Sequence, residues 1–236
     1  MRHIIKFSAL AFTLVAVAAI AGGPAMAQVA PTTSEAAAYM GLHAAAQKGD
    51  IAKIEKLAAA KADLNARDSN GRTPLHVASF AKQRDAIRAL VKAGADINLL
   101  DKDRYDGVTI ASVADDEETL RVLLASGASA KLITSRYDGT ALIAAAHLGH
   151  DGVVKQLIAA GAPLDHVNNL HWTAAIESVV LGNGGVRHQE TLRALIKAGA
   201  NLQLADRQGN TPLQLATARG YTEMVKMLAS TTPASK

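Results

Sequence analysis

The feature that most constrains the fold of this chain is a near-constant period. Five apolar runs each end in a doublet whose second residue is Ala, and the first residue is Gly in four of the five. The doublets are Lys61-Ala62, Gly94-Ala95, Gly127-Ala128, Gly161-Ala162 and Gly199-Ala200, at spacings of 33, 33, 34 and 38 residues. A repeat of this length predicts stacked units, each of which buries its apolar face against its neighbours.

Each unit is predicted to contain two helices. Before the doublet, apolar residues recur at helical spacing, as at Ile87, Leu90 and Val91, and Gly supplies the left-handed backbone that ends a helix. A short polar stretch with Asp, Asn and Gly follows, which is typical of a turn or hairpin. A Thr then precedes an Ala-rich run, as in 73–78, and Thr suits the N-cap of a helix. The sequence therefore predicts an all-α solenoid.

These motifs resemble those of the ankyrin-repeat family. The stretches DSNGRTPLHVAS (68–79) and DRQGNTPLQLAT (206–217) are close to that family's signature, and the 33-residue period agrees with it. The resemblance covers roughly 39–229 and implies an α-solenoid of about six ankyrin repeats, with helix-turn-helix pairs joined by β-hairpin-like loops. It also implies that His43, His76 and His150 bond the backbone between repeats. The chain is similar in particular to secreted bacterial ankyrin proteins, for which an interaction role is implied and a catalytic one is not.

The N-terminus has the three parts of a secretory signal peptide. Arg2 and Lys6 carry positive charge, an apolar run follows over 7–20, and Ala25-Met26-Ala27 has the small-x-small spacing of a cleavage site. The alternative is an uncleaved anchor, but a membrane-spanning helix needs roughly 20 apolar residues and this run is shorter. We therefore predict a cleaved signal peptide at 1–27 and a periplasmic or secreted mature chain.

The mature chain divides into three predicted segments. These are a flexible leader at 28–38, an ankyrin-repeat solenoid at 39–230 and a flexible tail at 231–236. The first helix pair, from Met40 to Lys61, lacks a preceding hairpin and is the predicted N-terminal cap. The last pair, from Thr211 to Ala229, is the predicted C-terminal cap.

Composition narrows the choice of partner. The signal peptide holds two cations and no acid, so its removal lowers the formal net charge from +4 to +2. Such a chain, without clustered Lys and Arg, shows no sign of nucleic-acid binding. It contains no Cys, which excludes a disulfide framework and a thiol nucleophile. We predict a monomer without cofactor or metal, without a nucleic-acid partner, and without membrane association after cleavage.

Two units depart from the regular pattern. The distance from the opening Thr to the closing Gly is 21 residues in two units, 18 in a third and 26 in a fourth. The short unit, from Thr109 to Gly127, is predicted to have lost about one helical turn. Asp115 and Glu118 have capping-box spacing where its second helix should begin. The long unit gains residues 182–188, a Gly-rich loop without the Lys-Ser/Thr of a phosphate-binding loop.

The tetrapeptide RYDG occurs twice, at 104–107 and at 136–139. Asp-Gly is typical of hairpin turns, and each copy falls just before the Thr of a first helix, so both are predicted to lie at hairpin tips. The turn does not require Arg or Tyr. Since helices of adjacent repeats pack about 8–10 Å apart, the two copies are predicted to stand side by side and to grip a partner.

Surface positions are therefore the candidate functional residues, and no catalytic set can be assigned from spacing. In ankyrin-like arrays the hairpin tips and the first helices line a concave face. The predicted tip residues are Arg104, Tyr105, Arg136, Tyr137 and Trp172, which is the only Trp in the chain. The predicted residues of the concave face are Phe80, His147, Leu148, Val180 and Leu181.

The sequence thus predicts a non-catalytic protein-binding scaffold of the bacterial envelope. It would recognise a protein partner through the concave face and hairpin tips of an ankyrin array. The alternative is a small-ligand or metal-binding periplasmic protein that uses the His-bearing hairpin at 165–171. In that hairpin Asp165, His166 and His171 could meet, although no fourth zinc ligand is evident.

Overall fold

The computed structural model describes residues 28–231, so the predicted signal peptide and the tail beyond 231 lie outside the described residues. A short helix, α1 (Thr33–Ala38), precedes six helix pairs, here called units 1 to 6. The inner helices are α2 (Gly41–Lys48), α4 (Pro74–Phe80), α6 (Gly107–Val113), α8 (Ala141–Leu148), α10 (Ala174–Val180) and α12 (Pro212–Ala218). The outer helices are α3 (Ile51–Ala59), α5 (Arg84–Ala93), α7 (Glu117–Ala125), α9 (Asp151–Ala159), α11 (Val186–Lys197) and α13 (Thr222–Ala229).

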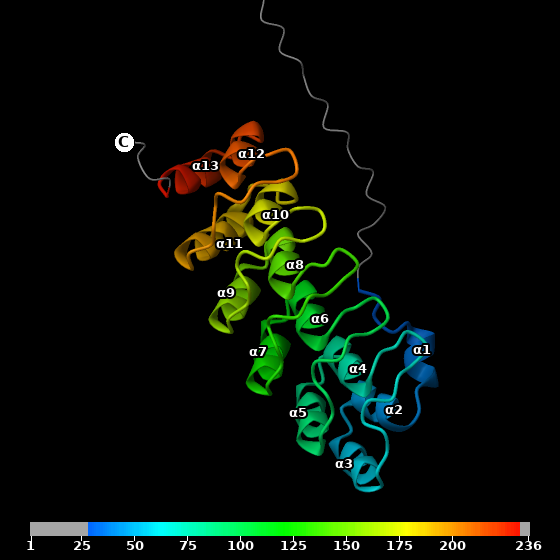
Figure 1. Ribbon diagram of the computed structural model, residues 1–236. Helices are drawn as coiled ribbons and strands as arrows, with labels where there is room; N and C mark the ends of the chain where they lie inside the picture. Colours follow the sequence, from blue (N-terminus) through cyan, green and yellow to red (C-terminus); the bar gives the residue numbers. More distant parts are fainter. Residues whose placement is uncertain (1–27, 232–236) are drawn as a thin grey trace, which may run out of the picture.

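The units stack into the predicted α-solenoid. The inner helices stand in one row, the outer helices form a second row beside it, and long loops project from the opposite side of the inner row (Figure 1). None of the helices in residues 28–231 is long and apolar enough to cross a membrane.

The predicted Thr N-caps are confirmed in units 2, 4, 5 and 6. In each, the Thr side chain accepts a hydrogen bond from the backbone N–H three residues on, which satisfies an otherwise free helix N–H. The predicted bonds from His to the backbone of a neighbouring repeat are present too. His43 bonds the carbonyl of Arg72, His76 that of Tyr105 and His150 that of Ser112, at 2.9, 3.0 and 2.8 Å.

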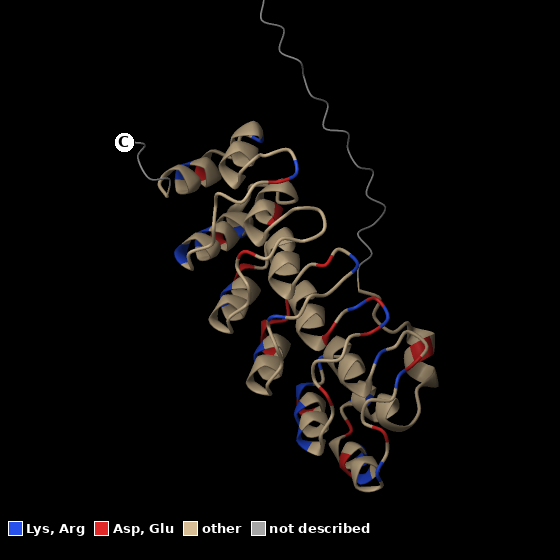
Figure 2. Cartoon of the chain, in the orientation of Figure 1, with Lys and Arg blue, Asp and Glu red and all other residues tan. Residues whose placement is uncertain are grey.

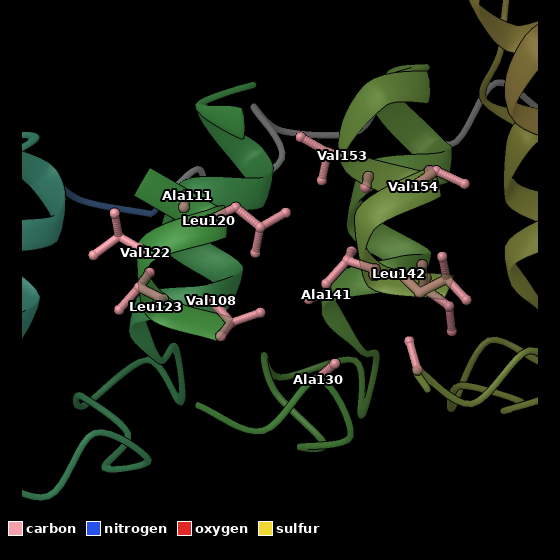
Figure 3. Packing of buried hydrophobic residues seen from close by; sticks show 14 of the residues in the cluster. Val108, Ala111, Leu120, Val122, Leu123, Ala130, Ala141, Leu142, Val153 and Val154 are labelled. Atoms are coloured by element: carbon pink, nitrogen blue, oxygen red, sulfur yellow. The ribbon is translucent and has the colours of Figure 1, made fainter. Parts of the chain in front are cut away.

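Small side chains allow the inner helices to pack closely. The fifth residue after the N-cap is a fully buried Ala in five units and a buried Ser178 in unit 5. The buried side chains of successive units form one continuous apolar cluster. Figure 3 shows this cluster at units 3 and 4, where Val108 and Leu123 of one unit and Ala141 and Leu142 of the next all belong to it. Each unit therefore depends on its neighbours for a complete core.

Unit 3 is not shortened, so the sequence prediction was wrong on this point. Asp106, rather than Thr109, is the N-cap of α6 and accepts the backbone N–H of Thr109. Counted from Asp106, the distance to Gly127 is 21 residues, as in the regular units. The outer helix α7 is likewise capped by Asp116 and not by Asp115. The prediction placed the start of this helix at Thr109, but Asp is as good an N-cap as Thr.

Residues 28–38 differ from the predicted flexible leader. Thr32 and Glu35 form a capping box at the start of α1. Arg72, which is fully buried in the loop before unit 2, donates to Oε1 of Glu35 at 2.9 Å and to the carbonyl of Val29 at 3.1 Å. The segment is ordered because it supplies acceptors to a buried cation.

The loops before units 2 to 6 are called tip loops here and span 65–72, 98–105, 131–139, 165–172 and 203–210. Backbone hydrogen bonds join the first four in sequence: Lys102 N–H to Asn70 O, Ser135 N–H to Arg104 O, and Asn169 N–H to Tyr137 O, at 2.9–3.0 Å. Within residues 28–231 the only β pairing is an isolated bridge between Thr134 and Gly139. The first four tip loops are therefore fixed as one row.

Candidate partner-binding surface

The two RYDG copies lie in adjacent tip loops and contact each other, as predicted. Nη1 of Arg104 lies 2.7 Å from Oδ1 of Asp138, and both side chains are about half exposed. The copies are not equivalent, however. Asp138 lies in its tip loop with a left-handed φ of 52°, whereas Asp106 is the buried N-cap of α6. Asp-Gly is therefore part of a tip only in the second copy.

A hollow of about 310 Å³ lies where the two copies meet. It is lined by Lys102, Asp103, Arg104, Tyr105 and Arg136. Burial raises the pKa of the Tyr105 phenol, Asp103 acts in the same direction and Arg136 opposes them. The phenol and the second Arg are therefore close in space. The lining holds three cations and one carboxylate, and one of the cations, Arg104, is already paired with Asp138. Lys102 and Arg136 are therefore the cations that could receive an acidic group.

The remaining predicted tip and concave positions differ in exposure. Leu148 and Leu181 are 40% and 44% exposed, as expected of contact residues, and Tyr137 is 42% exposed. Phe80, His147 and Val180 are half-buried. Trp172 is also half-buried, and its backbone N–H and carbonyl are both bonded to Asn168. These bonds fix the backbone of Trp172 in its tip loop, and its role as an interface anchor stays a prediction.

Three further exposed apolar side chains were not predicted. Ile133, Val167 and Leu170 are 45%, 39% and 37% exposed, and all three lie in the tip loops of units 4 and 5. Together with Tyr137, Leu148 and Leu181 they make six of the nine large apolar side chains that are exposed in residues 28–231. Nothing in the sequence indicated these three residues, because isolated apolar residues are common in polar loops.

Sequence reasoning also missed Glu177. Charged residues are found on the outer helices and loops, whereas the inner row has almost none (Figure 2). Glu177 in α10 is the one acidic residue of the six inner helices, and it is only 4% exposed. Its Oε1 accepts a hydrogen bond from Asn168 Nδ2 at 3.1 Å. Its Oε2 has no hydrogen-bond partner among the described residues and lies 3.4 Å from Nδ1 of His147.

The register of the units contains the signal for Glu177. It is the fourth residue after the N-cap of its inner helix. The residue at this position is apolar in every other unit: Ala44, Val77, Ile110, Ala144 and Leu215. An alignment of the units on their N-caps would have singled out this acid.

The insertion at 182–188 folds back over the neighbouring units. Arg187 forms a two-pronged ion pair with Asp115 of unit 3, at 2.7 and 3.1 Å, and contacts Asp151 of unit 4 at 3.2 Å. His188 donates through Nε2 to the carbonyl of His147 at 2.9 Å. The insertion therefore supports the end of α8 from which His147 and Leu148 project.

The His-bearing hairpin does not bring its three candidate ligands together. His166 bonds the carbonyl of Asp138 at 2.6 Å, Asp165 accepts the backbone N–H of Asn201 at 2.7 Å, and His171 lies 3.4 Å from Nε of Arg207. Over residues 28–231 no group of three or more His, Cys, Asp or Glu could hold a metal ion. These side chains join neighbouring loops, so the geometry does not favour the alternative function.

The fold and this surface define a class of protein: a solenoid of helix pairs that presents a fixed row of loops and one helix row for contact. The chain belongs to the ankyrin-repeat family. The family model "Ankyrin repeats (3 copies)" matches residues 17–101 and 108–206, and "Ankyrin repeats (many copies)" matches 187–229. Ankyrin repeat domains are generally non-catalytic scaffolds for protein–protein interaction.

Bacterial relatives support the assignment. The chain is 36% identical to the putative ankyrin repeat protein YahD of Escherichia coli (strain K12) over 185 residues, which are 78% of this chain and 92% of the relative. It is 45% identical to an ankyrin repeat domain from Acinetobacter baumannii AYE of known crystal structure. That match has a TM-score of 0.75 and covers 80% of this chain and 96% of the other.

A third similar structure comes from a complex. It is a chain in the structure of the Bd0816 predatory endopeptidase from Bdellovibrio bacteriovorus with the immunity protein Bd3460. The match has 26% sequence identity and a TM-score of 0.64, and it covers 82% of this chain and 99% of the other.

Proposed function

We propose that this chain is a non-catalytic scaffold of the bacterial envelope that binds a protein partner through the concave face and tip loops of units 4 and 5. The observation that carries this proposal is the location of the exposed apolar side chains. Six of the nine in residues 28–231 lie between Ile133 and Leu181, on these two units. A concentration of exposed apolar residues on two neighbouring units supports an interaction surface there.

The mechanism is recognition by a preformed surface. The backbone bonds between tip loops and the contacts of the insertion hold the contact residues in place before a partner arrives. Little conformational entropy is then lost on binding, so more of the contact free energy appears as affinity. The cationic hollow beside Tyr137 supplies a polar rim to an apolar centre, as in other protein interfaces.

The envelope location rests on the N-terminal sequence, which has the charge, apolar run and small-x-small spacing of a signal peptide. The similarity to a chain in the complex of a Bdellovibrio endopeptidase with its immunity protein is consistent with a bacterial protein partner. Mass spectrometry of the chain purified from its host should give an N-terminus at Gln28. An intact Met1 in the membrane fraction would instead indicate an uncleaved anchor.

Site-specific photocrosslinking in intact cells tests the binding surface. The crosslinker p-benzoylphenylalanine replaces Tyr137 in one strain and Lys92, an exposed residue of the outer helix α5, in the control strain. We expect a discrete adduct with one envelope protein at position 137 and none at position 92. A second change, Leu181→Ala, should weaken the adduct without unfolding the chain. The same adduct from both positions would contradict the proposed surface.

A further inference from the structure

We propose that Glu177 determines the specificity of the concave face by receiving the guanidinium group of an Arg side chain of the partner protein. This inference rests on the proposed function and names the chemistry of one contact within it. Three observations carry it: the incomplete pairing of a buried carboxylate, its position at a register that is apolar in every other unit, and its contact with the partly exposed His147.

The carboxylate of Glu177 is buried without full compensation. Removing a charge from water costs several kcal/mol unless hydrogen bonds and an opposite charge replace the lost water. Glu177 receives one hydrogen bond, from the neutral amide of Asn168, and its Oε2 receives none. No Lys or Arg lies within ion-pair distance of this carboxylate in the part of the chain that the structure describes. The carboxylate of Glu177 therefore lacks a Lys or Arg partner, and a cation from another molecule could supply one.

Asp106 is a second buried acid with an unpaired oxygen, but it has a structural role that Glu177 lacks. Its Oδ2 also lacks a partner, but Asp106 is the N-cap of α6, where Oδ1 accepts both the N–H and the hydroxyl of Thr109. That acid has a structural task at the position it occupies. Glu177 stands at a position where every other unit has an apolar residue, and it caps no helix.

The contact of Glu177 with His147 leads toward the predicted concave face. Nδ1 of His147 lies 3.4 Å from Oε2, and 35% of the His147 side chain is exposed, compared with 5% for Glu177. Leu181 lies one helical turn beyond Glu177 on the same face of α10, and Leu148 follows His147. A side chain that displaced the imidazole of His147 would take its place beside Oε2 of Glu177.

An Arg side chain fits this arrangement better than a Lys side chain does. Its guanidinium is more weakly hydrated than an ammonium and offers several N–H donors in a plane, which suits a buried carboxylate. Its aliphatic stem can lie along Leu148 and Leu181 while the charged end reaches Glu177. The partner would therefore present an Arg within an otherwise apolar segment.

The test uses the full mature chain and two small probes, N-acetyl-arginine methylamide and its neutral isostere N-acetyl-citrulline methylamide. Binding is followed by NMR through the ring signals of His147 and the methyl signals of Leu148 and Leu181. We expect the arginine probe to shift these signals and the citrulline probe to leave them unchanged. Glu177→Gln should weaken the arginine probe at least about tenfold, whereas Glu223→Gln, at an exposed acid of α13, should not.

His147→Ala gives an independent check, because it removes the side chain that competes for Oε2. This variant should bind the arginine probe at least as tightly as the natural chain. Equal binding of both probes, or unchanged binding by Glu177→Gln, overturns the inference. The photocrosslink from position 137 does not depend on Glu177, so its persistence in that case leaves the proposed function intact, and its absence contradicts the function itself.

Discussion

Arg72 and Glu177 are both buried charges, but the fold pairs them very differently. The guanidinium of Arg72 contacts Oδ2 of Asp68 at 2.7 Å and Oε1 of Glu35 at 2.9 Å, and it donates to a backbone carbonyl as well. Glu177 has one hydrogen bond, and among the described residues its second oxygen has only the imidazole of His147, at 3.4 Å. A buried charge whose partners lie within the chain holds the chain together. A buried charge that is incompletely paired within the chain can instead be paired by a group of another molecule.

The location of the two charges follows the same division. Arg72 lies at the N-terminal end of the array, where its ion pair with Glu35 holds α1 against the loop before unit 2. Glu177 lies in unit 5, next to Leu148 and Leu181 and close to the insertion. The N-terminal end carries the fully paired charge, and units 4 and 5 carry the proposed contact surface. Substitutions at the paired and the unpaired charge should therefore have effects of opposite sign on stability.

The largest effect is expected for Arg72→Met. The change leaves Asp68 without its main cation in a buried site and removes the donors that hold α1. Breaking a buried pair in this way costs about 3–5 kcal/mol of the free energy of unfolding. Urea denaturation followed by circular dichroism measures it. Arg193→Met is the matched control, since its exposed pair with Glu190 is worth less than about 1 kcal/mol. Equal losses of unfolding free energy for Arg72→Met and Arg193→Met would contradict the contrast between a buried and an exposed ion pair.

A smaller effect is expected for Asp68→Asn, roughly 2 kcal/mol at neutral pH, because hydrogen bonds to a charged group are lost. Burial alone would raise the pKa of Asp68, but bonds from Tyr39 and Arg72 outweigh burial and hold the pKa below its usual range. Its stabilisation is therefore fully present above the unfolded value of about 3.9 and is lost as the pH falls further. The difference between variant and natural chain should shrink below about pH 4.

Asp106→Asn gives the opposite pH dependence. Burial raises the pKa of Asp106, although hydrogen bonds from Thr109 partly offset it. The charged form is disfavoured in the folded chain, so the free energy of unfolding rises as the pH falls through the raised pKa. Asn is an equally good N-cap and should stabilise the chain at neutral pH, with a gain that disappears in acid. Denaturant unfolding at a series of pH values checks Asp68→Asn and Asp106→Asn. If the free energy of unfolding of the two variants depended on pH in the same way, the predicted difference between the two carboxyl groups would be wrong.

Glu177→Gln is expected to stabilise the chain by about 1 kcal/mol, since it removes a buried charge and keeps an acceptor for Asn168. The shape of the side chain hardly changes, so packing is preserved. The melting temperature in calorimetry measures this gain, and Glu223→Gln at an exposed site should leave it unchanged. A loss of stability would mean that Glu177 and His147 form a structural pair like that of Arg72.

Much of the fold could be predicted because its markers are local. A Gly-Ala doublet and a Thr cap each report on a few neighbouring residues, so the unit count and most helix starts were correct. The error at unit 3 arose because Asp106 caps a helix in place of Thr. The order of the leader could not be foreseen, since Glu35 binds Arg72 across 37 positions and no local pattern records such a pair.

The candidate site was less accessible to sequence reasoning. Exposure of Leu148 and Leu181 followed from their register at the end of the inner helices. The half-buried environment of Trp172 depends on how its tip loop folds, which only a three-dimensional arrangement shows. Glu177 was visible in the sequence, but its meaning depends on the absence of a partner. An absent contact leaves no pattern along the chain.

The smallest effect is expected for Arg187→Ala, which removes the ion pairs between the insertion and units 3 and 4. The side chain of Arg187 is half exposed, so these pairs contribute roughly 0.5 kcal/mol in dilute buffer. Added salt screens exposed charges, so the difference from the natural chain should vanish near 1 M NaCl. Arg72→Met should keep its full effect at that salt concentration, because its pairs are buried. Urea unfolding at both salt concentrations separates the two cases. A salt-independent loss for Arg187→Ala would show that the insertion is a third region held, like the N-terminal end, by desolvated charge.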